Sequence, residues 1–144
     1  MTYKRVNDRI IVRLDIGDEV IESLKTLARI ERIPGGALTG LGAVGDVTLA
    51  YYHLKSRSYE TVRLEEDVEV VSLTGNIGWL GDEPVIHAHA VVSRADCSTA
   101  GGHVMRAVVS VTVEVMVLVY AERLERAPVP EIGLNLLRLG PPQE

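Results

Sequence analysis

Apolar and polar residues alternate near the start of the chain, and the pattern then changes to a helical period. Over residues 10–15 the alternation predicts a strand. From Glu19 onward the apolar side chains recur at i, i+3 and i+4 spacing, which predicts an amphipathic helix. Acidic residues gather at the start of this segment and basic residues at its end, as the helix dipole favours. Pro34 and the two glycines after it end the predicted helix.

The rest of the chain has the patterns of strands and turns. We expect strands over residues 37–44, 47–52, 59–64, 68–73, 85–92 and 104–120, the last forming one long strand or two. Repeated Val and Thr weigh against a helix in this last segment. Breaks between these strands are expected where glycines, polar residues or prolines gather. Glycines predict a flexible connection at Gly75–Gly81, and polar residues predict a loop at 94–102. Prolines predict a linker at 127–130, which is followed by an apolar tail over 131–140 and a polar terminus.

One helix with six or more strands predicts an α+β fold, a single domain over residues 1–144 with a mostly antiparallel sheet. A single helix cannot cover both faces of such a sheet. The remaining apolar surface must be buried by curling of the sheet or by self-association, and we favour self-association. The glycine-rich segment Gly36–Gly45 would allow close backbone approach. Strands flank these glycines, which argues against a nucleotide-binding loop.

Composition narrows the class of protein. Nearly half of the 144 residues are apolar, and the net charge of −5 with scattered Arg and Lys argues against a nucleic-acid-binding domain. The single cysteine, Cys97, excludes an internal disulfide and fits a reducing compartment. The first residues lack an apolar leader, and the longest apolar stretch, Val111–Tyr120, is too short to span a bilayer. We therefore expect a cytoplasmic protein that does not bind membranes.

Three of the four histidines are placed as metal ligands would be. His87 and His89 project from one face of a predicted strand, because side chains alternate along a strand. His103 follows a glycine pair at the head of the next apolar run. Three imidazoles would leave an open coordination position on zinc.

The alternative is a chance pair whose imidazoles bond backbone carbonyls or face solvent. We favour a metal because His87 and His89 share their strand face with Val85 and Val91, and buried polar groups need partners. His53 has no partner motif, and we interpret it as structural or exposed.

Other polar residues are candidates for supporting roles. Glu114 interrupts a Val-rich strand and is either an exposed strand residue, a hydrogen-bond acceptor for a ligating histidine, or a catalytic acid/base near the metal. Arg106, three residues past His103, is a surface cation or a site for an anionic ligand. Cys97 is a passive loop residue or a fourth metal ligand.

Six segments carry a resemblance to a known family. In order they are residues 17–24, 37–44, 69–76, 87–90, 101–103 and 112–115. Together they resemble the plant-and-prokaryote-conserved (PPC) domain family. The resemblance implies a compact α+β domain that assembles as a homotrimer, with zinc on His87, His89 and His103. It also implies a fold similar to that of acetolactate decarboxylase, a metal enzyme with a three-histidine site.

In plants the PPC domain follows an AT-hook, a short Arg-Gly-Arg-Pro DNA-binding motif, and mediates protein association. This chain contains no such motif, so we expect the trimer and the metal to carry over rather than DNA binding. Two functions remain open. One is a trimeric, metal-stabilised ligand-binding or protein-interaction module, with a small anionic ligand in the open position. The other is a zinc-dependent lyase resembling a decarboxylase, acting on a small oxo acid with Glu114 as proton donor.

Overall fold

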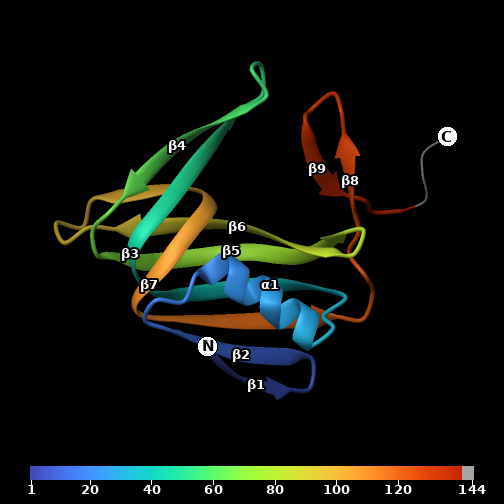
Figure 1. Cartoon of the computed structure of the whole chain (residues 1–144), viewed down its shortest axis with the longest axis horizontal. Helices are drawn as coiled ribbons and strands as arrows, with labels where there is room; N and C mark the ends of the chain where they lie inside the picture. Colours follow the sequence, from blue (N-terminus) through green and yellow to red (C-terminus); the bar gives the residue numbers. More distant parts are fainter. Residues whose placement is uncertain (141–144) are drawn as a thin grey trace.

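The computed structural model describes residues 1–140, which form nine strands and one helix (Figure 1). The strands are β1 (Thr2–Val6), β2 (Arg9–Asp15), β3 (Gly35–His53), β4 (Ser58–Leu64), β5 (Val68–Leu80), β6 (Glu83–Ser93), β7 (Thr99–Tyr120), β8 (Arg126–Val129) and β9 (Leu134–Leu137), and the helix is α1 (Val20–Ile30). The predicted single α+β domain with a mostly antiparallel sheet is confirmed. The predicted polar terminus, residues 141–144, lies outside the described residues.

Seven strands form one antiparallel sheet in the order β1-β2-β7-β6-β5-β3-β4. Strand β7 also pairs with β3 along most of its length, so β7, β6, β5 and β3 close into a ring. The sheet therefore curls, which buries one of its faces within the chain. Strands β8 and β9 form a separate hairpin. The second half of β3 (residues 47–53) pairs with β4 and forms a two-stranded arm, the β3–β4 arm. This arm and the β8–β9 hairpin both project from the same side of the main sheet (Figure 1).

Glycines allow β3 and β7 to approach closely inside the chain. Gly42 has a φ of +151°, and a Cβ there would lie 2.1 Å from the carbonyl oxygen of Thr112 on β7. The register of β3 shifts around this residue against both β5 and β7. A β-bulge bends a strand and increases its twist, as closing this sheet requires. The close approach expected of Gly36–Gly45 in support of self-association occurs instead between two strands of one chain.

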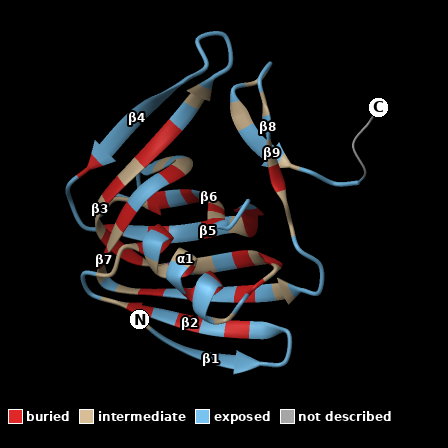
Figure 2. Cartoon of the chain, turned by 45° about the vertical axis from the view of Figure 1, so that its right-hand side comes forward, coloured by how far each residue is buried: buried red, intermediate tan, exposed pale blue. Residues whose placement is uncertain are grey.

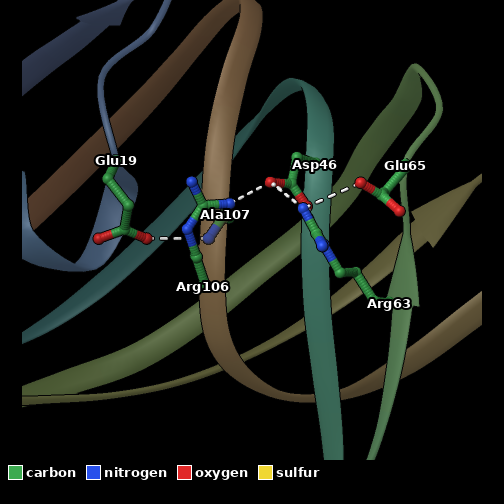
Figure 3. Close-up of polar contacts among 6 residues, drawn as sticks. All are labelled: Glu19, Asp46, Arg63, Glu65, Arg106 and Ala107. Carbon is green, nitrogen blue, oxygen red and sulfur yellow. Dashed lines mark hydrogen bonds and ion pairs between the residues drawn. The ribbon is translucent and has the colours of Figure 1, made fainter.

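Helix α1 is fixed at its start by a carboxylate. Glu19 precedes the helix, and its side chain accepts a hydrogen bond from the backbone N–H of Glu22 at 2.7 Å. The other oxygen of Glu19 accepts from the backbone N–H of Ala107 on β7 at 2.8 Å, so one side chain caps the helix and ties it to the sheet (Figure 3). The helix buries an apolar stripe against the core, as the period predicts: Val20, Ile21, Leu24, Leu27 and Ala28.

Several predicted breaks are wrong because the strands are longer than the sequence pattern indicates. Strand β3 runs without a break through Gly45, and β5 continues through Gly75 and Gly78, where a flexible connection was expected. The polar loop shrinks to residues 94–98, and the predicted linker at 127–130 lies mostly in β8. Glycine interrupts the hydrophobic pattern here without interrupting the backbone pairing, because extended neighbours fix it on both sides.

The core lies between the concave face of the curled sheet and α1. Side chains alternate in burial along β2, β6 and much of β7, so each of these strands has one buried and one outer face (Figure 2). Strand β4 exposes every residue except Leu64. Within residues 1–140, α1 is too short to cross a bilayer.

Candidate metal centre

His87, His89 and His103 come together on the outer face of the sheet. His87 and His89 lie on β6, and His89 stands directly opposite His103 of β7 in the antiparallel register. The three ring centroids form a nearly equilateral triangle with sides of 5.2, 5.3 and 5.3 Å. One nitrogen of each ring lies within 4.8 Å of the others. The structure thus brings all three predicted ligands together.

The expectation that His87 and His89 are buried among apolar residues, which favoured a metal, is partly wrong. Val85 is half-buried and Val91 is 40% exposed, and His89 is itself exposed. The buried side chains of β6 lie on the opposite face: Pro84, Ile86, Ala88, Ala90 and Val92. Burial among apolar residues therefore does not explain the histidines. Strand pairing does, because residues opposite each other in adjacent antiparallel strands project from the same face.

The donor set fits a tetrahedral zinc ion. Zinc lies about 2.0–2.1 Å from a histidine nitrogen, which places the centroids of three such rings roughly 5 Å apart. The observed separations of 5.2–5.3 Å match this spacing. Three neutral imidazoles are the ligands that zinc sites with an open position commonly use. His87, His89 and His103 would hold the ion.

His87 and His103 are kept neutral by their surroundings. Burial, followed by the nearby His87, His89 and Arg126, lowers the pKa of His103 to about 4. Burial, followed by Arg126 and His89, also lowers the pKa of His87. A metal ligand must be deprotonated, so these rings are ready to bind at neutral pH.

The histidines open onto a cavity of about 420 Å³ with mainly aromatic and apolar walls. Tyr59 of β4 stacks on His103, with ring centroids 5.4 Å apart and planes inclined by 27°. Tyr52 of β3 lies beside Tyr59 at 4.9 Å, and its hydroxyl donates to the carbonyl of Ile132 in the β8–β9 hairpin at 2.6 Å. Leu134 of β9 completes the lining. The β3–β4 arm and the β8–β9 hairpin thus form the walls of the cavity beside the three histidines.

The lining of this cavity contains no carboxylate. A cation does lie nearby. Arg126, at the start of β8, is 8% exposed, and its Nη2 donates to Oδ1 of Asn76 at 2.7 Å. Asn76 stands directly opposite His87 in the strand register. Sequence reasoning missed Arg126, because the following proline-rich residues indicated a linker.

The other candidates lie elsewhere. Glu114 is exposed on β7, eleven residues past His103, and it stands opposite Arg13 and Leu41. Glu114 belongs neither to the group of possible metal ligands nor to the lining of the cavity, so the structure does not bring it to the histidines. Cys97 lies in the exposed loop between β6 and β7 and is not part of the ligand group. His53 pairs with Glu60 at 2.8 Å, outside the cluster.

Arg106 is engaged by a carboxylate rather than free for a ligand. It pairs with Asp46, which also accepts two hydrogen bonds from Arg63 at 2.9 and 3.1 Å (Figure 3). Arg63 pairs in addition with Glu65 at 3.0 Å. This charged cluster joins β3, β4 and β7. It is a structural network, and Arg106 does not reach the histidine site.

Comparison with known families gives one match that spans most of the chain. The sequence model of the Plants and Prokaryotes Conserved (PCC) domain matches residues 1–121. The resemblance found in the sequence is thereby confirmed. The match ends before β8 and β9, so the hairpin that carries Arg126 lies beyond it. No curated protein matches the chain.

Solved structures with the same fold cover nearly the whole chain. A candidate DNA-binding protein from Ralstonia eutropha JMP134 is 33% identical, with a TM-score of 0.90 and 96% of each chain covered. One from Bacteroides thetaiotaomicron VPI-5482 is 31% identical, with a TM-score of 0.92 and coverage of 95% of this chain and 96% of that one. A metal-containing protein from Archaeoglobus fulgidus is 25% identical, with a TM-score of 0.85 and coverage of 96% and 99%.

The predicted likeness to acetolactate decarboxylase holds for the fold alone. The α-acetolactate decarboxylase of Bacillus subtilis is 13% identical to this chain, with a TM-score of 0.55. The likeness covers 85% of this chain but 57% of the enzyme.

Proposed function

Since the chain belongs to the Plants and Prokaryotes Conserved domain family, we propose that it is a metal-binding module of that family. Its three histidines would hold zinc and present an open coordination position to a small anionic ligand. The observation that supports this most strongly is the triangle of imidazoles, 5.2–5.3 Å on each side, formed by residues of two strands. The metal-containing relative from Archaeoglobus fulgidus supports it further.

Zinc is the metal that fits the donor set best. Imidazole also suits copper, iron and nickel, but a three-histidine set with one free position is typical of zinc. Zinc held in this way acts as a Lewis acid and lowers the pKa of a bound water. The chain itself would supply the three nitrogens, the aromatic wall beside His103 and the positive charge of Arg126.

We favour a binding module over a lyase because the cavity beside the histidines has few side chains that could act as a general acid or base. Decarboxylation of an oxo acid needs a proton donor close to the metal in addition to the metal itself. The lining residues include no Asp, Glu or Lys, and Glu114 lies far along β7. The hydroxyl of Tyr52, one of the tyrosines in the lining, already donates to the carbonyl of Ile132.

We propose that the module assembles as a homotrimer through the outer face of β2, β7 and β3. A groove of about 540 Å³ lies there, and its lining is almost wholly apolar. Ile11, Met116 and Leu118 are each at least 39% exposed along it. An exposed apolar patch of this kind marks an interaction surface. In a cyclic trimer this groove would meet a different surface of the next copy, because the interfaces of such a ring are heterologous.

DNA binding is not part of the proposal, although two similar structures are candidate DNA-binding proteins. The chain is acidic, and its exposed arginines are largely paired with carboxylates, as at Arg63 and Arg106. A salt-sensitive complex of submicromolar affinity with duplex DNA would contradict this. The exposed free Cys97 suits a reducing compartment, and we propose a cytoplasmic location.

The test is the metal content of the protein purified without added metal. We expect close to one zinc per chain by elemental analysis. Absence of zinc, together with failure to take it up from a zinc buffer, would refute the proposal.

A further inference from the structure

The C-terminal hairpin places a buried cation beside the histidine site. Arg126 is 8% exposed, and no carboxylate among residues 1–140 forms an ion pair with it. A buried charge without an opposite charge is costly and needs a reason. In this respect Arg126 differs from Arg63 and Arg106, which share the carboxylate of Asp46.

The guanidinium is bracketed by two residues that adjoin the cavity. Its Nη2 donates to Oδ1 of Asn76, which stands opposite His87. Its Nη1 donates at 2.9 Å to the carbonyl of Asn135, the residue after Leu134, which lines the cavity. Arg126 therefore lies at the edge of the histidine site, between the sheet and the hairpin.

Some N–H donors of the Arg126 guanidinium have no hydrogen-bond partner in the described chain. Arginine has five N–H donors, and the two bonds to Asn76 and Asn135 use two of them. The Nε atom is buried without a partner. It lies 3.4 Å from the position that a Cβ on residue 78 would occupy, so Gly78 leaves room for the guanidinium.

Charge then decides the class of ligand. A divalent metal on three neutral histidines makes a positive site whose lining has no acid to balance it. Arg126 adds to this charge from behind Asn76 and Asn135, outside the lining itself. The balancing charge must come from the ligand. Guanidinium groups match planar oxyanions such as carboxylates. Tyr52, Tyr59 and Leu134 give the cavity aromatic and apolar walls, which favour an organic acid with a flat or apolar body over free phosphate.

We propose that the site binds a small organic carboxylate whose acid group is held by Arg126 and whose flat or apolar body lies against the tyrosine wall. This rests on the proposed metal-binding function and deepens it. The ligand's acid group would face the hairpin, and the metal's open position would lie within its reach. The β8–β9 hairpin, beyond the segment that matches the family, would then set ligand specificity.

The test uses the full chain loaded with cobalt, whose visible absorption spectrum reports on the metal's ligands. Benzoate is the probe, benzamide its neutral counterpart, and inorganic phosphate the alternative anion. We expect benzoate to bind with a change in the spectrum, and benzamide to bind at least tenfold more weakly. Arg126→Gln should weaken benzoate binding roughly tenfold to hundredfold, the range for a lost charge-assisted hydrogen bond.

Two further variants separate ligand binding from folding. Arg138→Gln removes an exposed arginine just beyond β9 and should leave benzoate binding unchanged. Arg126→Lys keeps the charge but loses the planar fork, and it should weaken benzoate binding severalfold while preserving cobalt uptake. It therefore serves as the test even if Arg126→Gln does not fold, because Arg126 also ties the hairpin to Asn76.

The outcomes are distinct. Failure of the wild type to take up cobalt or zinc would overturn both the metal-binding function and this proposal. Cobalt uptake with equal affinity for benzoate and benzamide, or with benzoate affinity unaffected by the Arg126 variants, would overturn this proposal alone. Phosphate binding that is tighter than benzoate binding and depends on Arg126 would overturn the assignment to an organic acid.

Discussion

His89 of β6 lies directly opposite His103 of β7, with ring centroids 5.3 Å apart. The two residues are fourteen positions apart in the sequence, and a short loop at residues 94–98 brings them together. His87 joins them from the same strand face as His89. The candidate metal centre is thus a product of strand register, and a shift of one residue in the pairing of β6 with β7 would destroy it.

Replacing one member of the triangle should abolish metal binding. We expect His103→Ala to reduce zinc from near one per chain to near zero, because two imidazoles cannot hold the ion at micromolar concentration. Elemental analysis after gel filtration measures this. His53→Ala is the matched control, since His53 pairs with Glu60 outside the cluster. Zinc retained by His103→Ala would show that the ligand assignment is wrong.

The close approach of β3 and β7 predicts a steric effect at Gly42. In Gly42→Ala the Cβ would lie 2.1 Å from the Thr112 carbonyl oxygen, at a φ of +151°. We expect the free energy of unfolding to fall by about 3 kcal/mol or more in chemical denaturation. Gly81→Ala has a φ of +58° but open space, and should cost only roughly 1–2 kcal/mol. Equal losses in the two variants would contradict this packing.

The charged cluster around Asp46 predicts a dependence of stability on pH. Arg63, and then Arg106, hold the pKa of Asp46 below its ordinary value of 3.8. A carboxyl whose pKa is lower in the folded state stabilises the protein above its unfolded pKa and loses this effect as pH falls through its folded pKa. Asp46→Asn should therefore lower Tm above about pH 5, and the difference from wild type should vanish below the folded pKa.

Thermal unfolding across this pH range provides the measurement. Asp82→Asn, in the exposed turn between β5 and β6, is the control, since Asp82 forms no ion pair within the described chain. A Tm difference for Asp46→Asn that is independent of pH would mean that lost packing, rather than lost charge, is responsible.

The apolar groove predicts the effect of a charge on assembly. Met116→Glu places a carboxylate among the exposed apolar side chains of β2, β7 and β3. We expect sedimentation to show a trimer for the wild type and a monomer for this variant. Ile16→Glu, in an exposed turn outside the groove, should stay trimeric. A wild-type monomer at micromolar concentration would refute the proposed assembly.

Much of the fold follows from local patterns, and the errors share one physical cause. The period of residues 20–28 gives α1, and the alternation in residues 10–15 gives β2. Strands β3 and β5 were cut short at glycines, because local propensity counts a glycine as a break. Their backbones are instead held extended by partners that are distant in sequence, such as β7 beside β3. Tertiary pairing overrode local preference.

Part of the candidate site could also be predicted from local sequence patterns, and part could not. Alternation along one strand predicts that His87 and His89 share a face, and the position of His103 after a glycine pair, at the head of the next apolar run, made it the third candidate. Arg126 was missed, because only the three-dimensional placement of the hairpin shows that this residue is buried beside Asn76. Glu114 was proposed because it interrupts an apolar strand. Its distance along β7 from His103 could be judged only once β7 was seen to be one strand of 22 residues.

We propose above all that three imidazoles hold one zinc ion on the outer face of the sheet. X-ray diffraction from crystals grown without added metal, collected on both sides of the zinc absorption edge, tests it most directly. We predict a single anomalous peak about 2.0–2.1 Å from one nitrogen each of His87, His89 and His103. The proposal would be contradicted if protein purified without chelators showed ordered histidine rings and no anomalous peak between them.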